Sequence, residues 1–305
     1  MMLEALVGAL KAKDIPLTRG VATATLCTFR IGGRAALLIE PRSPQELVDS
    51  VRACKACGVR YVLLGRGSNI LFDDGELSLA LIRTTKINRV QMLHDGMCAQ
   101  CGASLMRLSY LAAKQGLAEL SFLCGIPGTL GGGILMNAGA YGYALSDVLE
   151  TVSVYDPDGD FEKTLINGEL NTSYRYSRFQ DENSVILHAR LRLRPGGCPE
   201  AILREMREKN ARRAQTQPLQ FPSAGSVFKR ICAEQPLSEM MDKMGLKGMR
   251  VGDAAVSKRH AGFIVNLGNA KAADVRRLIS NIQDLIEKER GIRPETEIRF
   301  IPSEV

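Results

Sequence analysis

A long uncharged run rich in glycine, residues 120–146, constrains this chain more than any other feature. Its 27 residues exceed the roughly 20 that an apolar helix needs to cross a bilayer, but seven glycines, a proline and an asparagine would make a poor helix. We therefore expect no membrane span. Small residues let a flat ligand lie against the backbone, and apolar neighbours favour a buried wall over a surface loop. These neighbours are Leu123, Ile126, Leu130, Ile134 and Met136.

A second glycine motif, residues 65–69 (GRGSN), follows a short buried strand that we predict at Tyr61–Leu64. The backbone amides of such a loop, with its Ser and Asn side chains, can surround a pyrophosphate without obstruction. The motif lacks the third glycine of a dinucleotide-binding GxGxxG, and the chain has no GxxxxGK[ST] P-loop. Taken alone, the motif is a weak indication of phosphate binding.

The length and net charge of the chain limit its number of domains and the kind of partner it can bind. Its 305 residues suit two domains, or three small ones, at roughly 150 residues per domain. The 40 Lys and Arg against 33 Asp and Glu give a net charge of +7, which suits an anionic partner such as a phosphorylated ligand, RNA or a membrane surface. Because only 5% of residues are aromatic, none is Trp and the basic residues are scattered, we expect no nucleic-acid groove.

The first residues, Met1 to Lys13, place apolar side chains at helical spacing. Glu4 lies within this stretch, which argues against a signal peptide. We therefore predict an amphipathic helix, no membrane partner and a cytoplasmic protein.

Eight cysteines include two CxxC pairs, Cys54/Cys57 and Cys98/Cys101, a spacing that zinc sites and redox dithiols use. The first pair ends a predicted helix. The second lies in a predicted strand, where residues three apart point to opposite faces. We therefore predict no metal site and reduced thiols, and the sequence leaves open whether either pair has a function.

Periodicity and turn residues predict most of the elements. Expected strands are 35–40 and 184–194, the latter with Ala189, Leu191 and Leu193 facing a core. Expected helices are 43–57, opened by Ser43-Pro44, and 104–115, stopped by glycine. Asp95-Gly96 and Asp158-Gly159 predict hairpins.

The run Pro195-Gly196-Gly197 is the strongest linker signal, so we place a domain boundary there. A helix is expected at 199–214. The last segment resembles a βαβ unit, with strands at 262–266 and 297–301 and a helix at 271–290.

Several specific motifs follow one another in one order along the chain. They are Thr28–Gly33, Leu64–Leu71, Gly125–Gly142, Tyr174–Ser177, Pro222–Phe228 and Glu295–Ile298. With these motifs the chain resembles the UDP-N-acetylenolpyruvoylglucosamine reductase family from about Thr28 to Ile301. The short stretch between Asp156 and Tyr174 is similar to the compact type II form of that family, which lacks an inserted subdomain.

The resemblance implies an α+β fold of the PCMH/VAO type. Two α+β subdomains, expected at 1–85 with the N-terminal helix and at 86–196, would bind FAD. A C-terminal α/β domain, expected at 197–305, would bind the substrate. In this family NADPH reduces FAD, and the flavin then passes a hydride to the enolpyruvyl carbon of a UDP-sugar, giving UDP-N-acetylmuramate.

The resemblance also assigns roles to residues. Arg175 and Glu297 would stabilise the intermediate, Ser226 would donate the proton, and Tyr174 and Lys229 would contact substrate. FAD is expected to be non-covalent, because Ser68 stands where related oxidases use His or Cys. Arg66 departs from the small or polar residue common in the family, and its role is open. The residues expected to bind FAD are Arg30, Gly65, Gly67, Ser68, Asn69, Ile70, Gly125, Pro127, Gly128, Thr129, Gly132, Asn137, Ala138 and Gly139.

Two alternatives stay open on the sequence. Another FAD-dependent oxidoreductase of this fold would share both glycine motifs but not Ser226 or Glu297. A non-enzymatic nucleotide- or RNA-binding module would explain the net charge of +7, but neither glycine motif. We expect a monomer.

Overall fold

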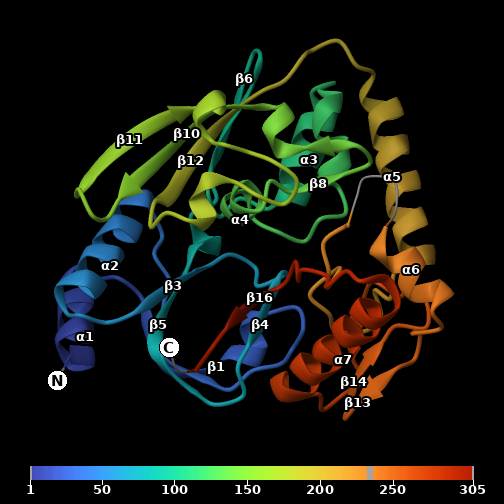
Figure 1. Cartoon of the computed structure of the whole chain (residues 1–305). Helices are drawn as coiled ribbons and strands as arrows, with labels where there is room; N and C mark the ends of the chain where they lie inside the picture. Colours follow the sequence, from blue (N-terminus) through green and yellow to red (C-terminus); the bar gives the residue numbers. More distant parts are fainter. Residues whose placement is uncertain (1, 232–235, 304–305) are drawn as a thin grey trace. The chain divides into compact units, whose positions relative to one another are not determined.

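The computed structural model describes residues 2–231 and 236–303, so Met1 of the predicted first helix lies outside it (Figure 1). The chain forms two compact units. The predicted domain boundaries at 85 and 196 stay predictions. The first unit comprises Met1–Thr18, Leu37–Arg66 and Leu79–Arg212, and the second comprises Arg19–Ala36, Gly67–Ser78 and Arg213–Val305.

The chain begins with two helices and a four-stranded sheet. Helices α1 (Met2–Ala12) and α2 (Pro44–Ala56) lie close together, and the apolar side of α1 is buried as predicted (Figure 1). The sheet has the strand order β1-β2-β5-β3. Strand β3 pairs with β5 in parallel, so that Leu64 lies opposite Arg83. The strands are β1 (Leu17–Ala22), β2 (Arg34–Ile39), β3 (Tyr61–Leu64) and β5 (Glu76–Arg83).

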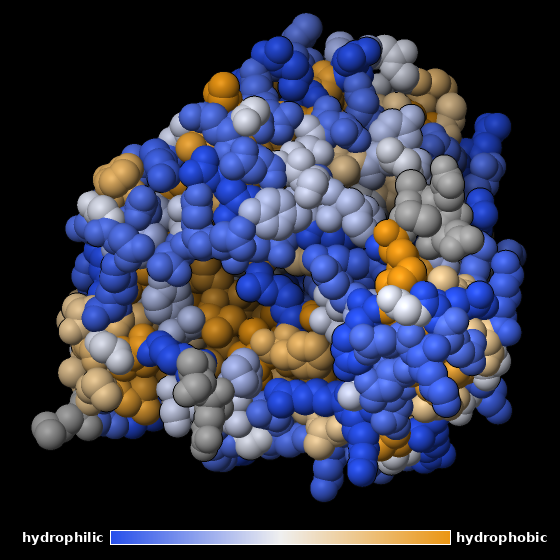
Figure 2. Space-filling view, viewed as in Figure 1, coloured by the Kyte–Doolittle hydropathy of each residue, from blue (hydrophilic) through white to orange (hydrophobic). Residues whose placement is uncertain are grey.

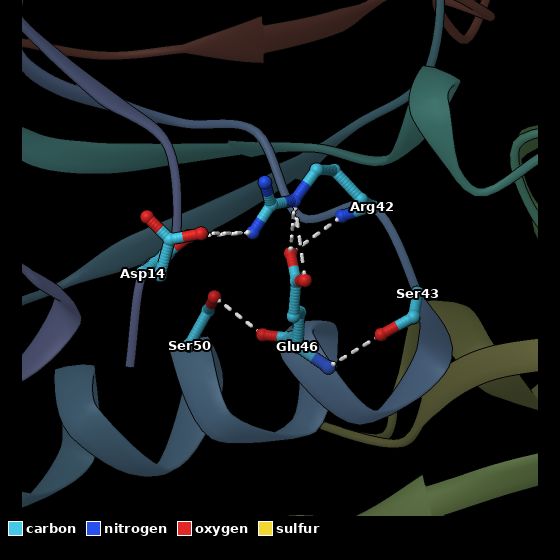
Figure 3. A network of polar contacts seen from close by, with 5 residues as sticks. All are labelled: Asp14, Arg42, Ser43, Glu46 and Ser50. Atoms are coloured by element: carbon cyan, nitrogen blue, oxygen red, sulfur yellow. Dashed lines mark hydrogen bonds and ion pairs between the residues drawn. The ribbon is translucent and has the colours of Figure 1, made fainter. Parts of the chain in front are cut away.

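A polar network fixes the start of α2 (Figure 3). The amide of Glu46 donates to Ser43 Oγ at 3.1 Å, and this makes Ser43 the N-cap, with Pro44 in the first turn as predicted. Arg42 lies between two carboxylates, with its guanidinium 3.2 Å from Glu46 and 3.1 Å from Asp14. The turn before α2 is therefore tied both to the helix and to the segment after α1.

We predict that Ser43→Ala lowers the free energy of unfolding by about 1 kcal/mol, because the Glu46 amide loses its acceptor. Urea denaturation followed by circular dichroism measures this change. Ser78→Ala, on the exposed side of β5, is the matched control and should change stability by less than about 0.5 kcal/mol. Equal effects of the two substitutions would contradict the capping role.

The first unit continues as an antiparallel five-stranded sheet with the order β11-β10-β12-β7-β6. Both predicted hairpins are confirmed, since Leu93 pairs with Gly96 and Asp156 pairs with Phe161. The alternation predicted around Ala189 is also confirmed, with that residue only 1% exposed. The strands are β6 (Val90–Leu93), β7 (Gly96–Gln100), β10 (Leu149–Asp156), β11 (Phe161–Ile166) and β12 (Val185–Arg192).

Helices complete the first unit. Helix α3 (Leu105–Lys114) ends as predicted before Gly116, which has a φ of +71°. Helix α5 (Pro199–Thr216) buries Ile202 and Met206 against Ala113 and Cys124. A single hydrophobic core runs from Leu6 to Leu193 and includes residues of both predicted FAD-binding subdomains.

Short elements connect these parts. Helix α4 (Leu130–Leu135) and the hairpin of β8 (Gly139–Ala140) with β9 (Tyr143–Ala144) lie in the glycine-rich run. The 3-10 turns are η1 (Thr23–Leu26), η2 (Thr84–Lys86), η3 (Ala118–Leu123), η4 (Leu145–Asp147), η5 (Asn167–Glu169) and η6 (Arg178–Gln180).

The second unit contains an antiparallel sheet with the order β13-β14-β15, helix α7 (Ala272–Arg290) and a shorter helix, α6 (Leu237–Lys243). Helix α7 packs against β13 and β14. Leu285 is 36% exposed, whereas the apolar side chains of Val275, Leu278, Ile279, Ile282 and Ile286 are buried. The strands are β13 (Arg250–Val251), β14 (Ala254–Val256) and β15 (Ile264–Asn266).

The predicted βαβ unit at the end of the chain is wrong. Strand β16 (Arg299–Ile301) pairs in parallel with β4 (Ile70–Phe72), so that Arg299 lies opposite Ile70, and β15 belongs to another sheet. A strand–helix–strand pattern predicts the elements but not their partners. Here the last strand pairs with the segment that follows the GRGSN motif.

Hydrophilic side chains cover most of the face shown in Figure 2. Within residues 2–231 and 236–303, no helix is long and apolar enough to span a membrane. The same residues contain no group of three or more His, Cys, Asp or Glu that could hold a metal ion. Burial raises the pKa of Cys54 and of Cys101 to about 12, so one thiol of each CxxC pair stays protonated at neutral pH.

Candidate functional site

The predicted site residues fall in both units, and each group is described within its own unit. In the first unit, Gly65 at the end of β3 lies against Thr129 at the start of α4. A Cβ added to Gly65 would lie 2.3 Å from Thr129 Oγ1. Thr129 is only 2% exposed and is the N-cap of α4, accepting from the Gly132 amide at 3.4 Å. Glycine at position 65 therefore allows the two segments to approach.

The glycine-rich run is attached to the segment before α3. The Leu105 amide donates to Gly128 O at 3.1 Å, and the Leu130 amide donates to Ala103 O at 2.8 Å. Next to them, the Gly131 amide donates to Cys101 O at 2.7 Å. These backbone bonds fix the course of the run where its side chains are too small to do so.

The run has one buried and one accessible side, as a wall for a flat ring requires. Of its apolar neighbours, Leu123, Leu130 and Ile134 are buried, whereas Ile126 and Met136 are half-buried. The small residues expected to contact FAD stay at least partly exposed. They are Gly125, Pro127, Gly128, Gly132, Ala138 and Gly139. This arrangement fits FAD, because accessible backbone backed by apolar side chains can contact a planar ring.

We predict that Gly65→Ala destabilises the protein by about 1–3 kcal/mol and lowers its FAD content, because the new Cβ must displace Thr129. Flavin absorbance per mole of purified protein and thermal unfolding measure the two effects. Gly8→Ala on α1, where a Cβ meets nothing within 4 Å, is the control. Normal FAD content in Gly65→Ala would contradict this role of the glycine.

Arg175 lies at the corner of a tight turn in the Tyr174–Ser177 motif. The backbones of Ser173 and Tyr176 pair across the turn at 3.1 and 3.2 Å. Arg175 has a φ of +57°, in the left-handed region that favours glycine. Its Nη2 donates to Gly139 O at 3.3 Å, and its guanidinium lies 5.1 Å from the ring centre of Tyr174. The turn thus brings Arg175 to the glycine-rich run, while Tyr174 is exposed.

Side chains around this turn hold it in place. Asn137 Nδ2 donates to Ser173 O at 3.0 Å, and Asn137 Oδ1 accepts from the Ser146 amide at 3.0 Å. Gln180 Nε2 donates to Arg175 O at 2.9 Å and to Leu135 O at 3.0 Å. The sequence assigned Asn137 to FAD binding and gave no role to Gln180. No sequence pattern marks Gln180, because its partners are revealed only by the folded turn.

We predict that Asn137→Asp destabilises the first unit by about 1–3 kcal/mol, because a buried carboxylate cannot donate to Ser173 O. Aspartate keeps the shape and the acceptor for Ser146, so the change isolates the lost donor. Asn88→Asp removes a comparable bond to Thr85 O at an exposed site and should cost less than about 0.5 kcal/mol. Chemical denaturation compares the two, and equal costs would refute the assignment.

The second unit holds the rest of the GRGSN motif. Gly67 has a φ of +63°, and a Cβ on it would lie 2.3 Å from Leu26 O. Its carbonyl accepts from the Thr28 amide at 3.1 Å. Ser68 and Asn69 follow it half-buried, and Ile70 begins β4. The segment is therefore packed tightly on one side while its Ser and Asn stay partly accessible, which fits a phosphate-binding loop.

One side-chain bond and several backbone bonds bring Asn69, Ser226 and Glu297 together. Asn69 Nδ2 donates to Glu297 O at 3.0 Å, and the Glu297 amide donates to Val227 O at 2.7 Å. The Val227 amide in turn donates to Gly262 O at 2.9 Å, and Ser226 forms a β-bridge with Phe263. Ser226 and Glu297, far apart in sequence, thus lie on hydrogen-bonded neighbouring segments, both half-buried.

The Thr28–Gly33 motif supports this arrangement. Thr28 Oγ1 donates to Ser223 O at 2.7 Å and so joins the motif to the Pro222–Phe228 segment. A Cβ on Gly32 would lie 2.2 Å from Thr23 Oγ1, and one on Gly33 would lie 1.9 Å from Gly75 O. Close packing explains why glycine occupies both positions.

Three basic residues have different surroundings. Lys229 Nζ lies 3.0 Å from Glu295 Oε2, and the Lys229 amide donates to Glu295 O at 2.9 Å. Arg30 is exposed and has a φ of +55°. Arg66 is also exposed. Substrate binding by Lys229 and FAD binding by Arg30 stay predictions.

The chain is similar in sequence to proteins of a known family. Residues 217–301 match the family model described as "UDP-N-acetylenolpyruvoylglucosamine reductase, C-terminal domain", and residues 35–164 match "FAD binding domain". A UDP-N-acetylenolpyruvoylglucosamine reductase from Caldicellulosiruptor saccharolyticus is 40% identical over 277 residues, which are 90% of this chain and 88% of the relative. One from Lactobacillus delbrueckii subsp. bulgaricus is 38% identical over 295 residues, 97% of this chain and 98% of the relative.

A solved structure is similar to this chain and comes from the same family. The crystal structure of UDP-N-acetylenolpyruvylglucosamine reductase from Thermus caldophilus matches 94% of this chain and 100% of its own, with a TM-score of 0.79 and 32% sequence identity. The predicted resemblance and the predicted α+β fold with an FAD-binding domain are confirmed. The chain belongs to the UDP-N-acetylenolpyruvoylglucosamine reductase family.

Proposed function

We propose that this chain reduces the enolpyruvyl group of UDP-N-acetyl-3-O-(1-carboxyvinyl)-glucosamine to UDP-N-acetylmuramate, with NADPH as hydride donor and non-covalent FAD as carrier. The reaction belongs to peptidoglycan precursor synthesis, and the proposal includes a monomer acting in the cytoplasm. The observation that carries it is the pair of hydrogen bonds that runs from the Asn69 side chain to the Glu297 carbonyl and from the Glu297 amide to Val227, the residue after Ser226. This link joins a predicted cofactor loop to two predicted catalytic residues.

FAD, when bound, supplies hydride transfer. The protein must then meet two demands of the substrate. Hydride addition to the terminal enolpyruvyl carbon, C3, leaves negative charge on C2 and on the conjugated carboxylate. That charge needs stabilising donors, and C2 needs a proton.

Arg175 meets the first demand in this proposal. A planar guanidinium can grip a carboxylate with two parallel hydrogen bonds. The bond to Gly139 O and the ring of Tyr174 fix the direction of the Arg175 side chain before substrate arrives. Such preorganisation avoids reordering a flexible side chain during the reaction.

Ser226 meets the second demand, and Glu297 shares the first demand with Arg175. A serine hydroxyl is a weak acid, so Ser226 gives up its proton only to a developing carbanion much more basic than itself. Glu297 acts in its protonated form, because a carboxylate would repel the charge on the substrate. Ser226 and Glu297 extend from two hydrogen-bonded neighbouring segments of the second unit.

The cofactor is held mainly by small residues. The amides of Gly65 and Gly67, with Ser68 and Asn69, would hold the pyrophosphate of FAD, and the accessible residues of the glycine-rich run would hold its ring. The partial accessibility of Ser68 and Asn69, next to the tightly packed Gly67, supports this role.

The proposal is tested on purified protein as isolated. We expect a yellow protein whose flavin absorbance bleaches with NADPH and recovers, without oxygen, only when the enolpyruvyl UDP-sugar is added. A yellow protein that ignores this substrate is another oxidoreductase, and a colourless protein that binds no FAD contradicts the proposal.

We predict that Ser226→Ala leaves bleaching by NADPH nearly unchanged and slows recovery with substrate by about 10²–10⁴-fold, because C2 loses its proton donor. Anaerobic stopped-flow absorbance separates the two half-reactions. Ser223→Ala, three residues away in the same segment, is the control and should keep both rates. An equal loss of both rates in Ser226→Ala would remove Ser226 from the proposal.

A further inference from the structure

His260 lies in a tight turn, residues 257–263, that pairs with the segment of Ser226. The Ser257 amide donates to Phe263 O at 2.8 Å, and the Phe263 amide donates to His260 O at 3.1 Å. Ser257, only 4% exposed, uses its hydroxyl oxygen to accept from the amides of Arg259 and His260 at 3.1 and 3.3 Å. The turn is thus closed by its own hydrogen bonds.

The imidazole of His260 is part of this turn. Its Nδ1 accepts from the Gly262 amide at 3.1 Å. Its ring packs edge-on against Phe263, with ring centres 5.0 Å apart. A Cβ on Gly262 would lie 3.1 Å from His260 Cε1 and 3.1 Å from Ser238 Cβ, so a side chain at position 262 would crowd the ring.

The peptide groups of Gly262 connect this ring to the proposed proton donor. The Gly262 amide is held by His260, while the Gly262 carbonyl accepts from the Val227 amide at 2.9 Å. Phe263, the next residue, forms the β-bridge with Ser226. We propose that His260 is a positioning residue, whose unprotonated Nδ1 holds the backbone against which Ser226 is placed. The inference rests on the proposed function for its catalytic consequence.

Protonation of His260 would break this contact, since a protonated Nδ1 is a donor and cannot accept from Gly262. The charged groups around the ring are Lys247 and Asp242, which pair with each other at 2.6 Å. Burial lowers the pKa of His260, and Lys247 lowers it further, while a hydrogen bond to the backbone of His260 itself and the charge of Asp242 raise it. The net effect favours the neutral ring at neutral pH, so the contact is lost only as pH falls through the lowered pKa.

The first test needs no activity. In ¹⁵N-labelled full-length protein, NMR should find His260 at neutral pH with its proton on Nε2. The amide signals of Gly262 and Val227 should then shift together on acidification, with the same midpoint as His260. A proton on Nδ1 at neutral pH, or a Val227 amide that ignores the titration, would overturn the inference.

The second test compares two substitutions of His260. Alanine removes the acceptor and should slow flavin recovery with substrate about tenfold or more, with little change in bleaching by NADPH. Asparagine can accept the same amide two residues on but does not titrate. His260→Asn should therefore restore most of the recovery rate and abolish the decline of that rate on acidification through the lowered pKa of His260. His188→Asn, at an exposed site on β12, should keep the wild-type pH profile.

These outcomes separate the inference from the proposed function. If wild-type flavin does not recover with the enolpyruvyl substrate, the proposed function fails, and NMR alone decides whether His260 holds Gly262. If wild type reacts as proposed and His260→Asn keeps the wild-type acidic decline, the inference is wrong. Should His260→Ala not fold, the pH profile of His260→Asn and the NMR titration still decide.

Discussion

Close approach of one backbone segment to another is the constraint on which both parts of the site depend. At Gly65 the space for a side chain is taken by Thr129, and at Gly67 it is taken by the Leu26 carbonyl. At Gly33 the neighbouring carbonyl of Gly75 leaves no room for a methyl group. Glycine is required at these positions because of packing, whatever ligand the loops bind. The same packing leaves backbone amides near the surface of loops with few side chains to cover them.

A second consequence is that the predicted catalytic side chains are placed through backbone bonds. The segment of Ser226 is joined to Glu297 by the carbonyl of Val227, whereas the Val227 amide joins it to Gly262. Arg175 differs, because side-chain bonds hold it: its Nη2 donates to Gly139 O, and its own carbonyl accepts from Gln180 Nε2. These bonds fix the backbone or the side chain of each predicted catalytic residue. Substitutions at residues that have no chemical role of their own would therefore displace the predicted catalytic side chains.

Local signals explain which parts of the fold were predictable. Ser43-Pro44 marks the start of α2 because capping acts within one turn, and Asp95-Gly96 marks a hairpin because the turn itself selects those residues. The pairing of β16 with β4 was not predictable in this way, since it joins residues far apart in sequence. Gln180 and His260 escaped notice for the same reason. Each acts on a partner that only the folded chain brings within reach.

Three residues with an unfavourable positive φ lie within the motifs that carry the family resemblance. Asn and Asp tolerate a positive φ, so Arg30, Tyr141 and Arg175 stand out, with φ of +55°, +57° and +57°. Each lies within one of the motifs shared with the family, and such a conformation costs about 1–2 kcal/mol unless its surroundings enforce it. At Arg175 the Gln180 side chain bonds the strained residue's own carbonyl. The positive φ of Arg175 therefore lowers the stability of the fold, and it directs the guanidinium differently from an extended backbone conformation.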